Sequence, residues 1–146
     1  MTAAPDVPAP AHVPPPDPLT ALLLELCAMP CVTGEEGPIA DWLADRYAAR
    51  GDMALRVGNS IVVAPPEAEG DERPTVLLVG HIDVVPPTPD DLVARIEGDL
   101  VVGRGSSDMK AGVAVGMHAF EDEGLRAGPY RLALVAYAGE EGPHEG

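Results

Sequence analysis

The strongest pattern along the chain is a continuous apolar run within residues 75–80. A run of this length without a charge, partly β-branched, predicts a strand buried on both faces. Residues 130–138 form a second apolar run and predict another strand. Between them, residues 109–123 are compatible with a helix and almost wholly apolar over 111–120, which predicts a buried helix. Strand, helix and strand in this order predict a βαβ unit with a right-handed crossover.

Helical spacing of apolar residues also appears before this unit. Asp17 suits the N-cap of a helix and Pro18 its first position, and the leucines that follow share one face. The remaining predicted elements are a helix over residues 17–29, a helix over 38–50, a hairpin of strands 53–57 and 60–64, and a short hairpin over 93–102. Residues 1–16 are rich in Pro and Ala without periodicity and predict a disordered tail. Residues 17–146 therefore hold an α/β domain.

Composition narrows the classes of partner. The formal net charge is -15, which argues against nucleic acid or an anionic membrane, since both require clusters of Lys and Arg. The first residues lack the basic and apolar stretches of a signal peptide, and no run approaches the roughly 20 apolar residues of a membrane helix. We therefore predict a cytoplasmic protein. Cys27 and Cys31 form one isolated pair, which is a weak zinc signal, and we expect both thiols to be reduced.

Three groups of acids or imidazole follow the ends of predicted elements: His81 with Asp83, Asp108, and the pair Glu140 and Glu141. Taken alone, each has an ordinary explanation: a surface histidine, a helix cap and a solvated loop. Because the carboxyl ends of sheet strands gather ligands, we expect these groups to meet at one edge. Such a cluster would repel itself and lose hydration unless a cation compensates. Imidazole and carboxylate ligands without thiolate suit zinc, or manganese or cobalt, in a hydrolytic role.

The spacing of these residues suggests a division of labour. His81 and Asp83 lie two apart on an extended segment, so they point to the same side, as a metal-binding imidazole and its orienting carboxylate do. Glu140 and Glu141 are adjacent and cannot both face one metal from an extended chain. One would bind metal while the other acts as general base on a metal-bound water.

Four segments resemble the signature motifs of the zinc-dependent exopeptidase and deacylase superfamily, which contains succinyl-diaminopimelate desuccinylase, acetylornithine deacetylase and glutamate carboxypeptidases. The segments are Met29-Pro30-Cys31-Val32-Thr33-Gly34-Glu35-Glu36, Gly80-His81-Ile82-Asp83-Val84-Val85-Pro86, Gly103-Arg104-Gly105-Ser106-Ser107-Asp108-Met109-Lys110-Ala111-Gly112, and Gly139-Glu140-Glu141-Gly142. They occur in the family's order and at plausible spacing. The resemblance is specific for the superfamily and weak for substrate.

The resemblance implies a zinc exopeptidase-like fold, a three-layer α/β/α arrangement with a mixed sheet, and two Zn2+ ions, with Co2+ or Mn2+ as substitutes. It implies that His81 binds one zinc, Asp108 bridges both and Glu141 binds the second. Asp83 would hold the His81 ring and Glu140 would be the general base. The implied reaction is hydrolysis of a linear amide, with two metals about 3.5–4 Å apart polarising carbonyl and water. N-succinyl-diaminopimelate is the favoured substrate. The alternatives are acetylornithine, if the enzyme is an acetylornithine deacetylase, and a peptide, if it is a carboxypeptidase.

The family's catalytic domain continues past the matched segments, with another carboxylate ligand, a distant His and a lid domain that mediates dimerisation. His144 and Glu145 are too near Glu141 in sequence to match these ligands, and His118 lies within the apolar helix. The resemblance therefore implies the N-terminal part of a catalytic domain, truncated at its C-terminal side and inactive in isolation, with a homodimer expected for the full-length enzyme. A non-catalytic fragment or interaction module is the alternative. The resemblance also implies a cis peptide bond at Asp108-Met109.

Overall fold

The computed structural model describes residues 15–66 and 70–142. Its elements are α1 (Pro18–Ala28), α2 (Gly37–Ala49), β1 (Met53–Val57), β2 (Ser60–Ala64), β3 (Thr75–His81), β4 (Arg95–Glu97), β5 (Leu100–Val102), η1 (Ser106–Lys110), α3 (Ala111–Glu121), α4 (Glu123–Arg126) and β6 (Arg131–Tyr137). η1 is an irregular turn, since Asp108 and Met109 have non-helical backbone angles. Residues 1–14 of the predicted tail lie outside the described residues, as do His144 and Glu145.

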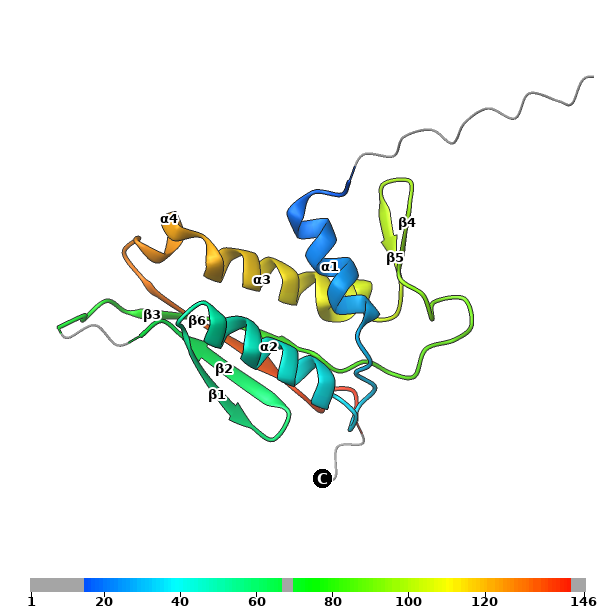
Figure 1. Cartoon of the computed structure of the whole chain (residues 1–146), viewed down its shortest axis with the longest axis horizontal. Helices are drawn as coiled ribbons and strands as arrows, with labels where there is room; N and C mark the ends of the chain where they lie inside the picture. Colours follow the sequence, from blue (N-terminus) through cyan, green and yellow to red (C-terminus); the bar gives the residue numbers. More distant parts are fainter. Residues whose placement is uncertain (1–14, 67–69, 143–146) are drawn as a thin grey trace, which may run out of the picture.

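Four strands form one mixed sheet in the order β1-β2-β6-β3, while β4 and β5 form a separate hairpin (Figure 1). β3 and β6 are parallel and are connected through α3, which confirms the predicted βαβ unit. β2 pairs antiparallel with both β1 and β6. The predicted α/β fold with a mixed sheet is therefore confirmed. None of the described helices is long and apolar enough to cross a membrane.

The hydrophobic core lies between the sheet and its helices. Residues paired across neighbouring strands point to the same face, and one such row faces the helices. This row consists of Ala54, Val63, Leu134 and Leu78. α2 and α3 cover it, and Tyr47 of α2 meets Phe120 of α3 edge to face, with ring centroids 5.4 Å apart. Gly80 allows α3 to approach β3 closely, because a Cβ there would lie 2.9 Å from Cγ2 of Val113.

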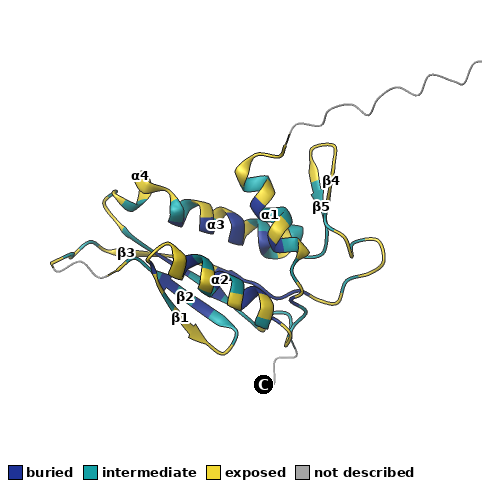
Figure 2. Cartoon of the chain, viewed as in Figure 1, coloured by how far each residue is buried: buried dark blue, intermediate teal, exposed yellow. Residues whose placement is uncertain are grey.

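The opposite face of the sheet is open over the described residues (Figure 2). Leu55, Leu77 and Val79 point to this face and are 62%, 59% and 55% exposed. The prediction that the strand at 75–80 is buried on both faces is therefore wrong for one face. α1 packs on α3, η1 and β5, so it does not form a layer there. The described residues thus form two layers, and the second helical layer of the implied α/β/α arrangement is not among them.

Candidate metal centre

Parallel pairing brings the ends of β3 and β6 to one edge of the sheet. His81, the last residue of β3, pairs with Tyr137, the last residue of β6, and the Ile82 N–H donates to the Tyr137 carbonyl over 2.9 Å. The chain leaves β6 through Gly139, whose φ of +84° turns the backbone sharply. Glu140 and Glu141 therefore follow β6 at the same edge where His81 ends β3, as predicted.

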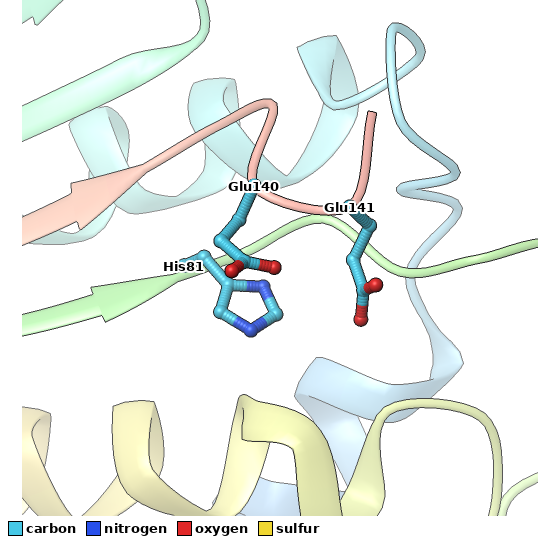
Figure 3. A group of neighbouring side chains, drawn as sticks. All are labelled: His81, Glu140 and Glu141. Atoms are coloured by element: carbon cyan, nitrogen blue, oxygen red, sulfur yellow. The ribbon is translucent and has the colours of Figure 1, made fainter. Parts of the chain in front are cut away.

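His81, Glu140 and Glu141 form a group that could hold a metal ion. Each offers one ligand atom, and these atoms all lie within 4.8 Å of one another. Figure 3 shows the Glu140 carboxylate beside the imidazole ring and the Glu141 carboxylate further along the same side. The expectation that the two glutamates cannot face the same metal assumed an extended chain. The turn at Gly139 removes that restriction, so both carboxylates reach the region of His81.

Asp108 reaches the same histidine from the Gly-rich turn. Its Oδ1 lies 3.1 Å from Nε2 of His81, although its side chain is 79% exposed. Gly105 makes this approach possible, because its φ is +75° and a Cβ there would lie 2.5 Å from Cγ1 of Val84. The Asp108-Met109 peptide bond is cis, as the resemblance implied. Asp108 thus contacts His81 without belonging to the three-residue group.

Asp83 is fully buried and anchors the turn that carries the glutamates. The backbone N–H of Glu140 donates to its Oδ1 over 3.1 Å, and the N–H of Glu141 donates to its Oδ2 over 2.9 Å. Burial by itself would raise the pKa of Asp83, but these donors and the hydroxyl of Thr33 hold it below its usual value. Asp83 is therefore a carboxylate that the protein itself keeps charged.

The contact between Asp83 and His81 differs from the expected one. Nδ1 of His81 lies 3.0 Å from the main-chain carbonyl oxygen of Asp83 and 3.5 Å from its Oδ1. A carbonyl and a carboxylate oxygen both only accept, so the contacts of Nδ1 with Asp83 and of Nε2 with Asp108 are both hydrogen bonds only when both ring nitrogens carry protons. In a neutral ring that donates from Nδ1, Nε2 turns its lone pair toward Asp108, where a cation can bind. The ring is still oriented by residue 83, but the backbone rather than the carboxylate supplies the acceptor.

Thr33 is a site residue that sequence reasoning did not assign. Its hydroxyl donates to Oδ2 of Asp83 over 2.9 Å. A parallel bridge between Val32 and Val84 places it there, together with a hydrogen bond from the Thr33 N–H to the Val84 carbonyl over 3.2 Å. The one sequence signal for Thr33 was the resemblance of segment 29–36 to a family motif. That resemblance did not indicate a contact with Asp83, which lies 50 residues later in the chain.

We call His81, Asp83, Asp108, Glu140 and Glu141 the rim cluster. Burial alone would lower the pKa of His81, but the bond to Asp108, the Asp83 carbonyl and the charges of Asp83 and Glu140 raise it. No Arg or Lys side chain of the described residues pairs with these four acids. An imidazole nitrogen and several uncompensated carboxylates fit a zinc ion, which prefers nitrogen and oxygen or thiolate ligands.

The other candidate groups lie outside the cluster. His118 is exposed on α3, and Cys27 and Cys31 are free thiols, as expected. Lys110, which follows the Gly-rich turn, is 1% exposed, and its Nζ donates to the carbonyl of Leu26 over 2.6 Å. That carbonyl belongs to the last turn of α1, where a cation is favoured by the helix dipole. Lys110 therefore joins α1 to the turn that carries Asp108.

Solved structures with the same fold include two dipeptidases. The chain matches aminoacylhistidine dipeptidase from Vibrio alginolyticus with a TM-score of 0.68 at 21% identity, over 86% of this chain and 28% of that one. It matches human carnosine dipeptidase 1 with a TM-score of 0.68 at 20% identity, over 86% and 32%. At these identities the likeness shows the fold, a part of the α/β domain of such hydrolases.

Sequence comparison gives the family. Residues 77–146 match the profile of Peptidase family M20/M25/M40. The succinyl-diaminopimelate desuccinylase of Bordetella avium is 34% identical over 131 residues, covering 84% of this chain and 34% of that protein. The enzyme of the same name from a Methylobacterium species is 37% identical over 145 residues, covering 88% and 36%. The chain belongs to peptidase family M20/M25/M40, a family of metallohydrolases, and it spans about a third of the length of these relatives.

Proposed function

We propose that the chain carries the metal-binding rim of a zinc-dependent hydrolase that cleaves the amide bond of an N-acylated amino acid. N-succinyl-diaminopimelate is the first substrate to test. The observation that carries this proposal is the meeting of His81, Glu140 and Glu141 at the ends of two parallel strands. Family membership and the names of the relatives support the reaction and the substrate. Because these relatives are about three times longer than their match to this chain, the activity is proposed for a catalytic unit of their size.

The ligands follow from the donor atoms at the rim. We assign His81, Asp108 and Glu141 to metal binding, with two Zn2+ ions as the resemblance implies and Co2+ or Mn2+ as substitutes. The 3.1 Å approach of Asp108 to Nε2 of His81 supports their shared role. Bound zinc would polarise the amide carbonyl and lower the pKa of water.

Glu140 is assigned the proton transfers. Its carboxylate would accept a proton from the attacking water and return it to the departing amine, which is the work of a general base and then a general acid. Asp83 has a positioning role, because its buried carboxylate holds the N–H groups of both Glu140 and Glu141. Thr33 in turn holds Asp83.

Zinc binding can be tested on the chain itself. Titration calorimetry in metal-free buffer should show saturable binding of Zn2+, and Glu141→Gln should weaken it by about tenfold or more, since it removes a ligand charge. Glu97→Gln, on the exposed β4 strand, is the matched control and should bind zinc as the unaltered chain does. The proposed site would be contradicted if the unaltered chain bound no Zn2+, or if the Glu141 variant bound Zn2+ as tightly as the unaltered chain.

Turnover is tested in a hybrid in which this chain replaces the matching segment of the Bordetella avium relative. The hybrid should release succinate from N-succinyl-diaminopimelate, and acetylornithine and a dipeptide complete the substrate panel. Glu140→Gln should retain zinc and lose turnover by a factor of about 100 or more, the range for a general base. Asp108→Asn should lose zinc as well as turnover. If both variants kept the same metal content and activity, the assigned roles would be wrong.

A further inference from the structure

Lys110 is a buried cation that the proposed reaction does not use. It is 1% exposed, and its Nζ donates to the main-chain carbonyl of Leu26 over 2.6 Å. No Asp or Glu side chain among the described residues forms an ion pair with it. Burying an ammonium without a carboxylate partner is costly, so an apolar side chain would serve better if packing were the only requirement. The cost indicates that the ammonium does more than fill space.

The backbone of Lys110 closes the Gly-rich turn that carries Asp108. Its N–H donates to the Gly105 carbonyl over 2.9 Å, so the chain between these two residues forms a loop that contains Asp108. Within the loop, Asp108 and Met109 have non-helical backbone angles. The Asp108 side chain is 79% exposed, and its one polar contact with a described side chain is the one with Nε2 of His81. The position of Asp108 therefore depends on how the two ends of the loop are held.

Close packing holds the Gly105 end of the loop. A Cβ on Gly105 would lie 2.5 Å from Cγ1 of Val84, so this backbone lies directly against the valine side chain. Val84 is itself 5% exposed, and its N–H donates to the Cys31 carbonyl over 3.0 Å. The other end of the loop depends on the Lys110 side chain, because its ammonium makes the hydrogen bond that leads out of the turn.

α1 is a firm support for that second end. The side chain of Leu26 is fully buried in the core, and α1 packs on both α3 and η1. Leu26 lies in the last turn of α1, where the carbonyl groups lack their usual helical partners and carry negative partial charge. Its carbonyl oxygen can therefore hold an ammonium without adding another carboxylate near the rim cluster. The Lys110 side chain thus joins the loop to a helix that the core keeps in place.

We infer that Lys110 is a positioning residue for the metal centre. By joining the Gly-rich turn to the end of α1, it holds the Asp108 carboxylate beside the imidazole of His81. The inference rests on the proposed function, because it takes Asp108 as a metal ligand. Residues that orient a ligand without touching the metal typically change metal affinity by about 10- to 100-fold when they are replaced. Lys110 itself supplies neither a ligand atom nor a proton.

Zinc titration of Lys110→Met tests this role. The variant keeps a long unbranched side chain but loses the donor to Leu26, so Zn2+ binding measured by titration calorimetry should weaken about 10- to 100-fold. Lys110→Arg keeps a donor and should bind zinc more tightly than the Met variant. Ile39→Val, at a fully buried residue of α2, is the matched control and should bind zinc as the unaltered chain does. Equal zinc affinity in Lys110→Met and the unaltered chain would overturn the inference.

A metal-free measurement tests the position of Asp108 directly. Crystal structures of the unaltered chain and of Lys110→Met would both be determined in the presence of a chelator. Oδ1 of Asp108 should stay about 3.1 Å from Nε2 of His81 in the unaltered chain and should leave that position in the variant. The backbone hydrogen bonds that Asp83 accepts should remain in both, because they do not involve the turn. If the variant kept the contact between Asp108 and His81, the inference would be wrong whatever the zinc affinity.

These measurements also separate the inference from the proposed function. If the unaltered chain bound no zinc, the proposed function would fail, and the metal-free structures would still show whether Lys110 holds Asp108. If Lys110→Met did not melt cooperatively, Lys110→Gln would replace it, because glutamine is one atom shorter and still polar. A folded variant that kept both the zinc affinity and the Asp108 contact would show that Lys110 only stabilises the fold.

Discussion

Two clusters of acidic residues at opposite ends of the molecule are stabilised by different means. Away from the rim, Asp52 and Glu121 lie among the arginines Arg46, Arg50 and Arg126. We call these five residues the helix-end cluster. Arg46 donates to both oxygens of Glu121 over 2.8 Å, and Arg126 donates to both oxygens of Asp52 over 2.6 and 3.1 Å. Arg50 lies 3.7 Å from each acid. This cluster is neutralised by the protein itself.

The rim cluster contains more acid, and no Arg or Lys among the described residues pairs with it. Its four carboxylates meet one imidazole, and the buried member, Asp83, is held by two backbone N–H groups and the hydroxyl of Thr33. Hydrogen bonds fix the position of a carboxylate but do not cancel its charge. The comparison shows that the fold can neutralise acids with arginine where it needs stability, and that it leaves the rim negative, as a cation-binding site requires.

The largest effect should come from breaking the helix-end cluster. Arg126→Ala leaves Asp52, whose side chain is 2% exposed, without its main partner. We expect the free energy of unfolding to fall by about 3 kcal/mol, the low end for removing one member of a buried ion pair. Denaturant melts would measure it. Arg95→Ala is the control, because its pair with Glu97 is exposed and should contribute less than about 1 kcal/mol. Equal losses in the two variants would contradict the comparison.

A smaller effect should follow at the rim from Thr33→Val. The substitution keeps the shape of the side chain but removes one of three donors to Asp83. The bond is partly buried, and a hydrogen bond to a charged group contributes about 1.5–3 kcal/mol. Thr33→Ser should restore most of the loss. Urea melts of the three proteins, followed by zinc titration, would show whether Thr33 acts through Asp83. If Val and Ser at this position behaved alike, the hydroxyl would have no positioning role.

The smallest effect concerns pH. Burial alone would raise the pKa of Glu121, but Arg46 lowers it below the ordinary value of 4.5. A lowered acid pKa contributes stability above the unfolded value and loses it as pH falls through the folded value. Glu121→Gln should therefore cost about 1 kcal/mol near neutral pH and progressively less below pH 4.5. A difference that stayed constant across this range would show that Glu121 is not held charged by Arg46.

The sequence predicted the parts of the site that depend on strand order. The apolar runs predicted β3, α3 and β6, and the parallel crossover then required His81 and Glu140 to share an edge. The prediction was less accurate for the start of the last long helix. η1 interrupts the predicted helix over 109–123, and α3 begins at Ala111. Periodicity reports apolar spacing and cannot detect such a turn.

The missed contacts depend on backbone geometry that spacing does not reveal. Thr33 reaches Asp83 through a bridge between distant segments, and two adjacent glutamates face one histidine because Gly139 turns the chain. The choice of a main-chain acceptor for His81 is likewise set by the local path of the backbone after β3. Patterns of residue type carry no information on these details.

The buried ammonium of Lys110 has a practical consequence, because this is the sole lysine of the chain. With its Nζ on the carbonyl of Leu26 and 1% of the residue exposed, the folded protein presents no lysine side chain to acylating reagents or to lysine-modifying enzymes. Covalent labelling of this amine would thus require α1 to separate from the Gly-rich turn, and the labelling rate would report how often that local opening occurs.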